Sequence, residues 1–143
     1  VSGTTEPFSR HQLERFVERH QDIVGVLCDG QLRLIIETLL SSKPVGAIAL
    51  FEYDPIHRRA GIGILIYAPE ARRKGYAHAA IEAIKRYARE TLALKQIWAS
   101  VAEDNRASIA LFEGCGFELC GRRKAWLRHH DGYADQLEYQ CIL

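Results

Sequence analysis

Residues 65–77 read LIYAPEARRKGYA and join an apolar strand, a basic turn and the start of a helix. Pro69 ends the strand because proline has no N–H group to donate to a neighbouring strand. The first turn of a helix has N–H groups without intrahelical partners and carries the positive end of the helix dipole, so it binds phosphate. The basic triplet 72–74 adds positive charge there, and Gly75 lets a ligand approach the backbone closely. This run therefore predicts an anion-binding unit.

Other phosphate-binding motifs match this run less well. A P-loop needs G-x-x-x-x-G-K-[ST], but here Lys74 precedes the glycine and no Ser or Thr follows. A dinucleotide fingerprint needs G-x-G-x-x-G, whereas Gly61 and Gly63 lack the third glycine and lie inside a predicted strand. Taken alone, the short pattern R-x-x-G-x-A favours a solvated basic turn before a helix.

The elements predicted around this unit mix helices and strands. Ser9 and Gln12 have capping-box spacing and open an amphipathic helix of about 14 residues. The short connections between the first three strands predict an antiparallel meander. The remaining segments are assigned from hydrophobic periodicity: strands Leu32–Thr38, Val45–Tyr53 and Ala60–Ala68, helix Gly75–Leu92, strand Gln96–Ala102, helix Asn105–Glu113, and strands Phe117–Leu127 and Ala134–Leu143 around the turn His130-Asp131-Gly132.

Length and composition indicate one soluble globular domain over residues 1–143. Hydrophobic residues make up 48% and charged residues 26% of the 143 residues. The net charge of +1 argues against a nucleic-acid or membrane-surface binder, which needs a strong basic excess. No apolar run approaches the roughly 20 residues of a membrane-spanning helix. The 4 cysteines contain no C-x-x-C pair and are typical of free thiols in a reducing compartment, so we expect a cytoplasmic protein.

A second motif makes the order of the predicted elements informative. Residues Asn105–Phe117 read NRASIALFEGCGF, after the long helix and a strand. Strand, R-x-x-G-x-A, helix, strand, N-x-x-S-x-x-L-F and G-F in this order resemble the GNAT acetyltransferases, which use acetyl-CoA. The phrases Ile56–Ala60 (IHRRA), Ile66–Glu70 (IYAPE) and Gly132–Asp135 (GYAD) are similar to bacterial spermidine (polyamine) N-acetyltransferases of the ribosomal-protein-acetyltransferase-like branch.

The resemblance implies a fold and a cofactor site. The fold is of the α/β class, with a mixed, mostly antiparallel central sheet flanked by helices. The family's first strand and the start of its first helix would precede Val1, so we expect them to be missing from this chain. Three groups of residues are implied for acetyl-CoA: Leu65, Ile66 and Tyr67 along the pantetheine arm; Arg72, Arg73, Lys74, Gly75, Tyr76, Ala77 and His78 around the pyrophosphate; and Asn105, Ser108 and Phe112 on the other side.

The catalytic groups are less clearly marked. Amine attack on a thioester needs a base, because an alkylammonium with a pKa near 10.4 must first lose a proton. Glu52 and Asp54 are the candidate bases, and Glu52 also matches an acidic position near the acceptor site of polyamine-acetylating relatives. Many relatives carry a tyrosine where this chain has Phe112, and that phenol is the expected proton donor to the leaving CoA thiolate. Phe112 cannot donate a proton, so Tyr133 is the nearest replacement donor. No ligand spacing predicts a metal site.

Two classes of function remain open from the sequence. The first is an enzyme that acetylates a primary amine, with a polyamine such as spermidine preferred over a protein N-terminus or lysine. The second is an acyl-CoA-binding protein with little catalysis, because Phe112 lacks the hydroxyl and the third strand has Gly61 where relatives often carry Glu. Those strand glycines also suggest a bulge. The last strand alternates apolar residues and predicts pairing or packing between subunits of a homo-oligomer.

Overall fold

The computed structural model describes residues 31–37, 44–66 and 75–143. The helix predicted after Ser9 and the predicted site residues Tyr67, Arg72, Arg73 and Lys74 lie outside these ranges. The described elements are β1 (Gln31–Glu37), β2 (Pro44–Asp54), β3 (Arg59–Ile66), α3 (Tyr76–Glu90), β4 (Gln96–Ala102), α4 (Arg106–Gly114), β5 (Glu118–His129) and β6 (Gly132–Ile142). Within these ranges, no helix has the length and apolar character needed to cross a membrane.

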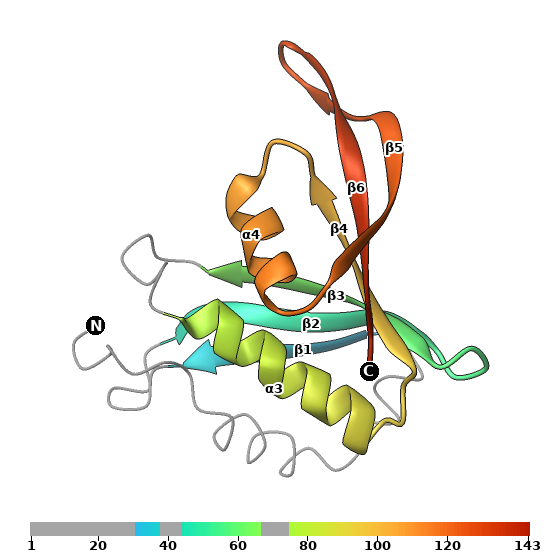
Figure 1. Ribbon diagram of the computed structural model, residues 1–143. Helices are drawn as coiled ribbons and strands as arrows, with labels where there is room; N and C mark the ends of the chain where they lie inside the picture. Colours follow the sequence, from blue (N-terminus) through green and yellow to red (C-terminus); the bar gives the residue numbers. More distant parts are fainter. Residues whose placement is uncertain (1–30, 38–43, 67–74) are drawn as a thin grey trace.

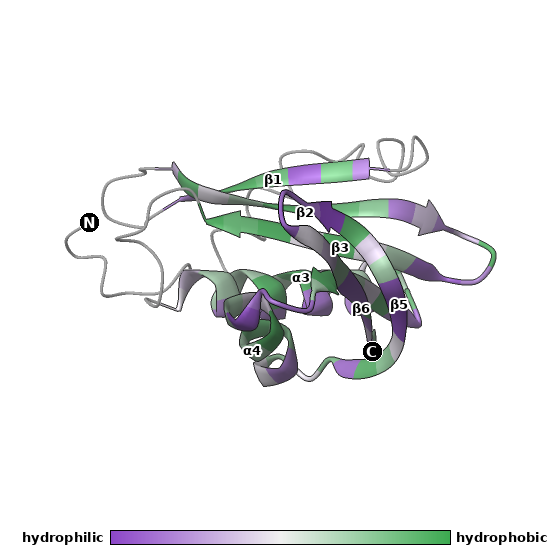
Figure 2. Cartoon of the chain, turned by 90° about the horizontal axis from the view of Figure 1, so that it is seen from above, coloured by the Kyte–Doolittle hydropathy of each residue, from purple (hydrophilic) through white to green (hydrophobic). Residues whose placement is uncertain are grey.

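The strands form one 6-stranded sheet in the order β1-β2-β3-β4-β6-β5. β1, β2 and β3 make the predicted antiparallel meander, and β4, β6 and β5 are also antiparallel to one another. β3 and β4 are parallel, because the chain between them passes through α3. The two helices lie on the same side of the sheet (Figures 1 and 2). The mixed, mostly antiparallel α/β fold predicted from the sequence is therefore confirmed.

The sheet forks between its two central strands. β3 and β4 pair only where residues 59–61 lie beside residues 96–98. Beyond this point β3 continues beside β2, while β4 continues beside β6, and the two strands point in different directions (Figure 1). The part of β3 from Ile62 to Ile66 therefore has no strand partner on its fork side in the described chain.

Alternation along the strands builds a core against α3. In β1, Leu32, Leu34 and Ile36 are buried while the residues between them face away. Helix α3 buries a face at the predicted helical spacing, formed by Tyr76, Ala80, Ile81, Ala83, Ile84, Tyr87 and Ala88. These side chains belong to one cluster with the buried residues of the strands. Burial of this face fixes the direction in which the first turn of α3 points.

A glycine occupies the base of the fork because no side chain fits there. The rings of Phe51 and Trp98 pack edge to face over Gly61, with centroids 5.3 Å apart and an interplanar angle of 86°. A Cβ atom on Gly61 would lie 2.5 Å from Cε2 of Phe51 and 2.8 Å from Cζ2 of Trp98. The two aromatic side chains therefore meet across β3 only because residue 61 has no side chain.

The strand irregularity expected at the glycines of β3 lies on the opposing strand instead. Between the pairs Phe51–Gly61 and Asp54–Arg59, β2 has two residues where β3 has one, which is a β-bulge. Glu52 in this bulge has a left-handed φ of 49°. Gly61 is needed for space, and the bulge lies on β2 instead of at the glycines of β3.

The prediction that the last strand pairs or packs between subunits is wrong. β6 lies between β4 and β5 and is not an edge strand. Its alternating residues Leu137, Tyr139 and Cys141 are buried in the core of this chain. β5 is the outer strand at this end of the described sheet, and most of its side chains are exposed.

We expect Gly61→Ala to lower the free energy of unfolding by about 1–3 kcal/mol, because the added methyl group overpacks the two rings. Gly63→Ala is the matched control, since its nearest neighbour would be Cε1 of Phe51 at an ordinary 3.5 Å. Urea unfolding of both variants measures the difference. Equal stability of the two variants would show that residue 61 is not sterically constrained.

Candidate functional site

The first turn of α3 is open to an anion. Gly75 caps the helix in a left-handed conformation with a φ of 81°, and among the described residues no side chain caps the helix N-terminus. No acidic residue lies in the first turn, so the positive end of the dipole is not neutralised from within the helix. Of the predicted residues here, Tyr76 is buried in the core, Ala77 is half-buried and His78 is exposed. Tyr76 is therefore available to a ligand only through its backbone.

The end of β3 presents a free strand edge towards the fork. Within the described chain, Ile66 and Leu65 pair only with Gly46 and Ala47 of β2, so their other side has no strand partner there. Leu65 is 59% exposed, and Ile66 packs against the core. Extended ligands pair with such an edge through main-chain hydrogen bonds. Two of the three predicted pantetheine-binding residues therefore have the geometry that pairing requires.

In α4 the predicted motif N-x-x-S is first of all a helix cap. The side chain of Asn105 accepts a hydrogen bond from the backbone N–H of Ser108, at 3.1 Å. Phe112 is buried and packs edge to face on Phe117, with ring centroids 5.0 Å apart. Asn105 and Ser108 therefore lie at the exposed start of α4, whereas Phe112 faces the core.

Glu52 lies in a cleft of about 620 Å³ beside the base of the fork. The lining residues are Glu52, Tyr53, Asp54, Pro55, Arg59, Trp98, Arg123 and Glu138. Trp98 and Glu138 alternate along their strands with buried residues, so they lie on the face of the sheet opposite to α3. The alternation of Trp98 with the apolar residues of β4 is the sequence signal for this position.

Charge pairing singles out Glu52 among the residues that line this cleft. The carboxylate of Asp54 pairs with Arg59 at 3.4 Å, and that of Glu138 pairs with Arg123 at 3.4 Å. Among the described residues, no hydrogen bond or ion pair engages the side chain of Glu52. Its left-handed φ is a strained conformation for a residue with a side chain, and strain of this kind gathers at functional sites. One unpaired carboxylate thus faces the cleft.

Asp54 is bound into the turn that follows β2 and is a poor base. Its Oδ1 accepts from the backbone N–H groups of Ile56 and His57, both at 2.9 Å, and its Oδ2 lies 3.0 Å from Nδ1 of His57. The hydrogen bond from the backbone of His57, and next the one from its side chain, lower the pKa of Asp54 to about 2. A carboxylate of such low basicity is ill suited to take a proton from an amine. Of the two candidate bases, Glu52 is therefore better suited than Asp54 to accept a proton.

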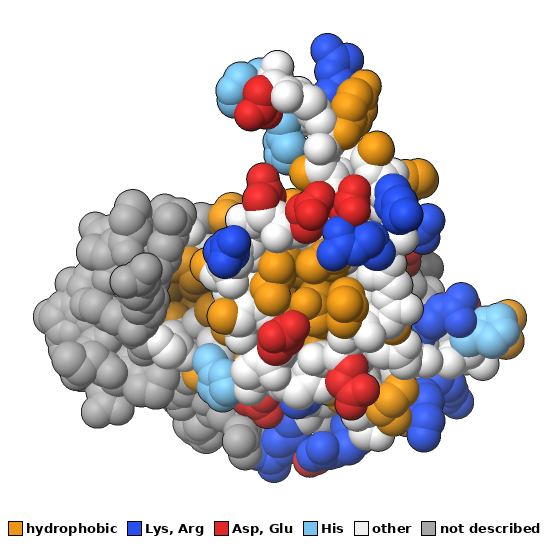
Figure 3. All heavy atoms as spheres, turned by 45° about the horizontal axis from the view of Figure 1, so that its top comes forward, with side chains coloured by type: hydrophobic (Ala, Val, Ile, Leu, Met, Phe, Trp, Pro, Cys, Tyr) orange, Lys and Arg blue, Asp and Glu red, His pale blue; other side chains and the backbone are white. Residues whose placement is uncertain are grey.

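Tyr133 lies in a different cleft. It is 67% exposed on the β5–β6 hairpin and lines a hollow of about 460 Å³ with Glu103, Asp104 and His129. This hairpin projects from the body of the molecule with His, acidic, basic and apolar side chains at its tip (Figure 3). Because Glu52 and Tyr133 line different clefts, the structure does not bring the two predicted catalytic residues together.

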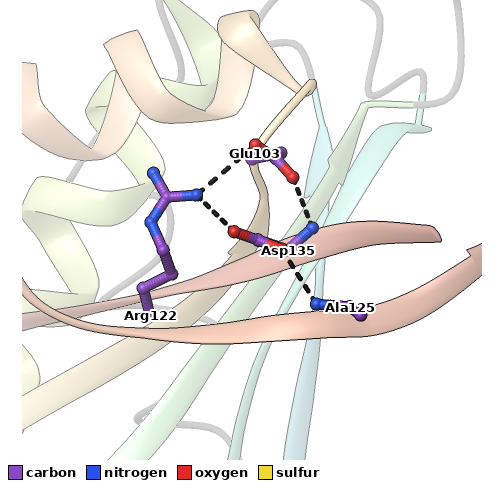
Figure 4. Close-up of polar contacts among 4 residues, drawn as sticks. All are labelled: Glu103, Arg122, Ala125 and Asp135. Atoms are coloured by element: carbon purple, nitrogen blue, oxygen red, sulfur yellow. Dashed lines mark hydrogen bonds and ion pairs between the residues drawn. The ribbon is translucent and has the colours of Figure 1, made fainter.

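A polar network fixes the hairpin beside the fork (Figure 4). Ala125 bulges out of β5 with a φ of 50°, and its N–H donates to Oδ1 of Asp135 at 2.8 Å. Arg122 donates to the other oxygen of Asp135 at 2.6 Å, and Glu103 accepts from the backbone N–H of Asp135. Trp126, next to this bulge, is 58% exposed and does not belong to the core.

Arg123, on the same strand, was missed by sequence reasoning. Its guanidinium lies 5.0 Å from the ring centroid of Trp126 and pairs with Glu138 in the cleft. The sequence carried no signal for this role, because the cleft forms only when β5, β6 and the turn after β2 meet across the sheet. The hairpin network thus supplies one wall of the cleft that holds Glu52.

Comparison with known proteins places this geometry in a family. The acetyltransferase (GNAT) domain matches residues 2–118. A spermidine N(1)-acetyltransferase of Vibrio cholerae is 32% identical over 113 residues, which are 78% of this chain and 61% of that protein. The chain thus spans less than two thirds of the length of this relative.

Solved structures agree with the sequence comparison. The crystal structure of the spermidine N-acetyltransferase from Vibrio cholerae in complex with CoA and spermine has a TM-score of 0.74 and 28% identity, covering 94% of this chain and 75% of that one. A dodecameric structure of the same enzyme in an intermediate state also has a TM-score of 0.74 and 28% identity, covering 94% and 74%. The forked sheet, the open helix start and the family match agree: this chain belongs to the GNAT acetyltransferase domain family.

Proposed function

We propose that this protein is an acetyl-CoA-dependent N-acetyltransferase that acts on a primary amine, with a polyamine such as spermidine as the acceptor. The observation that carries the proposal is the unpaired carboxylate of Glu52 in a cleft at the base of the fork. The similarity to a spermidine N-acetyltransferase whose crystal structure holds CoA and spermine supports the same assignment. It also supports a homo-oligomer, since that relative is described as dodecameric.

The chain offers a place for each part of acetyl-CoA. The free edge of β3 at Leu65 and Ile66 pairs with the amide groups of the pantetheine arm. The first turn of α3, from Gly75 to His78, takes the diphosphate, and the basic triplet 72–74 adds charge beside it. When bound, acetyl-CoA supplies the activated acetyl group, and backbone N–H groups of β3 polarise its carbonyl.

The chemistry is a direct transfer in a ternary complex. Glu52 takes a proton from the ammonium group of the acceptor, directly or through a water molecule. The amine nitrogen then forms a bond to the carbonyl carbon, the carbon–sulfur bond breaks to release the CoA thiolate, and the nitrogen passes its second proton to solvent to leave a neutral amide. The thiolate of a thiol with a pKa of about 8.5 leaves without a proton donor and takes its proton from solvent. The missing hydroxyl at Phe112 therefore slows the reaction without abolishing it.

The charges of the cleft favour a cationic acceptor. Asp54 and Glu138 are balanced by Arg59 and Arg123, which leaves the negative charge of Glu52 uncompensated in the cleft. A polyamine carries several ammonium groups, so one can react while another contacts the acidic wall. The indole of Trp98 lines the same cleft and offers a face for cation–π contact.

One observation favours a second candidate function, an acyl-CoA-binding protein with little catalysis. Phe112 is buried and carries no hydroxyl, and Tyr133, the predicted replacement donor, lines another cleft and does not meet Glu52. A protein N-terminus or a lysine side chain remains the alternative acceptor for an active enzyme.

Release of free CoA thiol from acetyl-CoA separates these functions. We expect release to rise with spermidine concentration, and to be weaker with a lysine-containing peptide or with a peptide that has a free N-terminus. Saturable acetyl-CoA binding without amine-dependent release would instead support the binding protein.

Glu52→Gln tests the base. We expect kcat with spermidine to fall by roughly 10²–10⁴-fold, because the amide does not accept the proton, while acetyl-CoA affinity stays unchanged. Asp54→Asn is the matched control, since its side-chain oxygen still accepts the two backbone hydrogen bonds of the turn. A larger loss of kcat in the Asp54 variant than in the Glu52 variant would contradict the assignment.

Gly75→Ala tests the helix start. A side chain at a φ of 81° is strained and crowds the N–H groups that face the diphosphate. We expect calorimetry to show acetyl-CoA binding weakened by about tenfold, which is the cost of roughly 1.4 kcal/mol. Gly114→Ala at the end of α4 is the control, because its Cβ would meet nothing within 4 Å. Unchanged binding in the Gly75 variant would place the diphosphate elsewhere.

A further inference from the structure

Three metal-binding side chains meet beside the first turns of α3. His78 and Glu82 lie one turn apart on this helix, and Cys115 follows the end of α4. A nitrogen of His78, a carboxylate oxygen of Glu82 and the sulfur of Cys115 all lie within 4.8 Å of one another. The Sγ atom of Cys115 is 3.3 Å from Nδ1 of His78, although the two residues are 37 positions apart in the sequence. No spacing rule for metal sites finds this group.

We propose that His78, Glu82 and Cys115 bind a zinc ion that joins α3 to the end of α4, with a water molecule as the fourth ligand. Imidazole nitrogen and thiolate sulfur favour zinc over magnesium, calcium or manganese, which prefer oxygen. Around tetrahedral zinc, sulfur lies about 2.3 Å and nitrogen or oxygen about 2.0–2.2 Å from the ion. The Sγ–Nδ1 separation of 3.3 Å already suits two ligands of one ion.

The accessibility of the three side chains suits entry of an ion. Cys115 is 2% exposed, whereas the side chain of Glu82 is 37% exposed and His78 is exposed. An ion therefore reaches the sulfur from the solvent side, between the imidazole and the carboxylate.

Lys85 accounts for the charge when no ion is bound. Its ammonium lies 3.4 Å from the Glu82 carboxylate and donates to the backbone oxygen of Cys115 at 2.6 Å. A zinc ion takes over the carboxylate, and Lys85 keeps its hydrogen bond to the carbonyl group. Lys85 therefore orders the loop that presents the sulfur.

The protonation of Cys115 distinguishes a metal ligand from a nucleophile. Burial, and next the Glu82 carboxylate, raise the pKa of the Cys115 thiol to about 11. A buried thiol of this kind is unreactive as a nucleophile. Zinc binding converts it to a thiolate: a sulfur–zinc bond forms, the S–H bond breaks, and about one proton passes to solvent.

Cobalt(II) titration of the purified protein tests the site, because cobalt replaces zinc and a thiolate ligand gives a charge-transfer band in the near ultraviolet. We expect the wild type and Cys120→Ser to show this band, since Cys120 is an exposed thiol on β5 outside the cluster. Cys115→Ser should lose the band. His78→Ala should weaken cobalt binding by roughly tenfold or more.

A thermal shift keeps the test decisive if the Cys115 variant folds poorly. His78 is exposed, so His78→Ala leaves the core intact; zinc should raise the melting temperature of the wild type but not of this variant. Absence of the band in the wild type, or an unchanged band in Cys115→Ser or unchanged affinity in His78→Ala, would overturn the proposal.

Discussion

The contact of Phe51 and Trp98 across Gly61 is the constraint on which the rest of the structure depends. It holds β3 and β4 together for only three residues before the strands separate. A continuous parallel pair would have used both edges of β3 for strand pairing. Among the residues that the structure describes, the fork leaves one edge of β3 free, and no side chain caps the first turn of α3, which begins beyond the end of that strand. A free strand edge and a helix start are complementary to the amide groups and the diphosphate of one extended cofactor.

The same contact also shapes the opposite face of the sheet. Trp98 lines a cleft in which the other carboxylates are paired and Glu52 is not. A bulge in β2 directs Glu52 there, and the Asp135 network holds the hairpin that forms the far wall. The contact of Phe51 and Trp98 therefore shapes both the proposed cofactor side and the proposed acceptor side of the sheet. We expect the reacting carbonyl at the fork between them.

Local patterns predicted most of the described fold, because each element is set by residues close in sequence. Apolar residues at helical spacing predicted both α3 and α4. The site was predicted less completely. Glu52 was found from its place at the end of a strand, but Arg123 and Glu138 reach the cleft only through pairing of β5 with β6. The last strand was misplaced at a subunit interface, since its alternation reports burial and cannot tell one chain's core from a contact between chains. The basic triplet 72–74 stays a prediction.

Amide hydrogen exchange with and without acetyl-CoA tests the central claim most directly. The account predicts slower exchange on binding at two separate places, residues 62–66 of β3 and the first turn of α3, because both would donate hydrogen bonds to the same bound molecule. Strand β1, which lies at the edge of the described sheet beyond β2, should exchange at an unchanged rate. Binding that protects neither of these two segments would contradict the account.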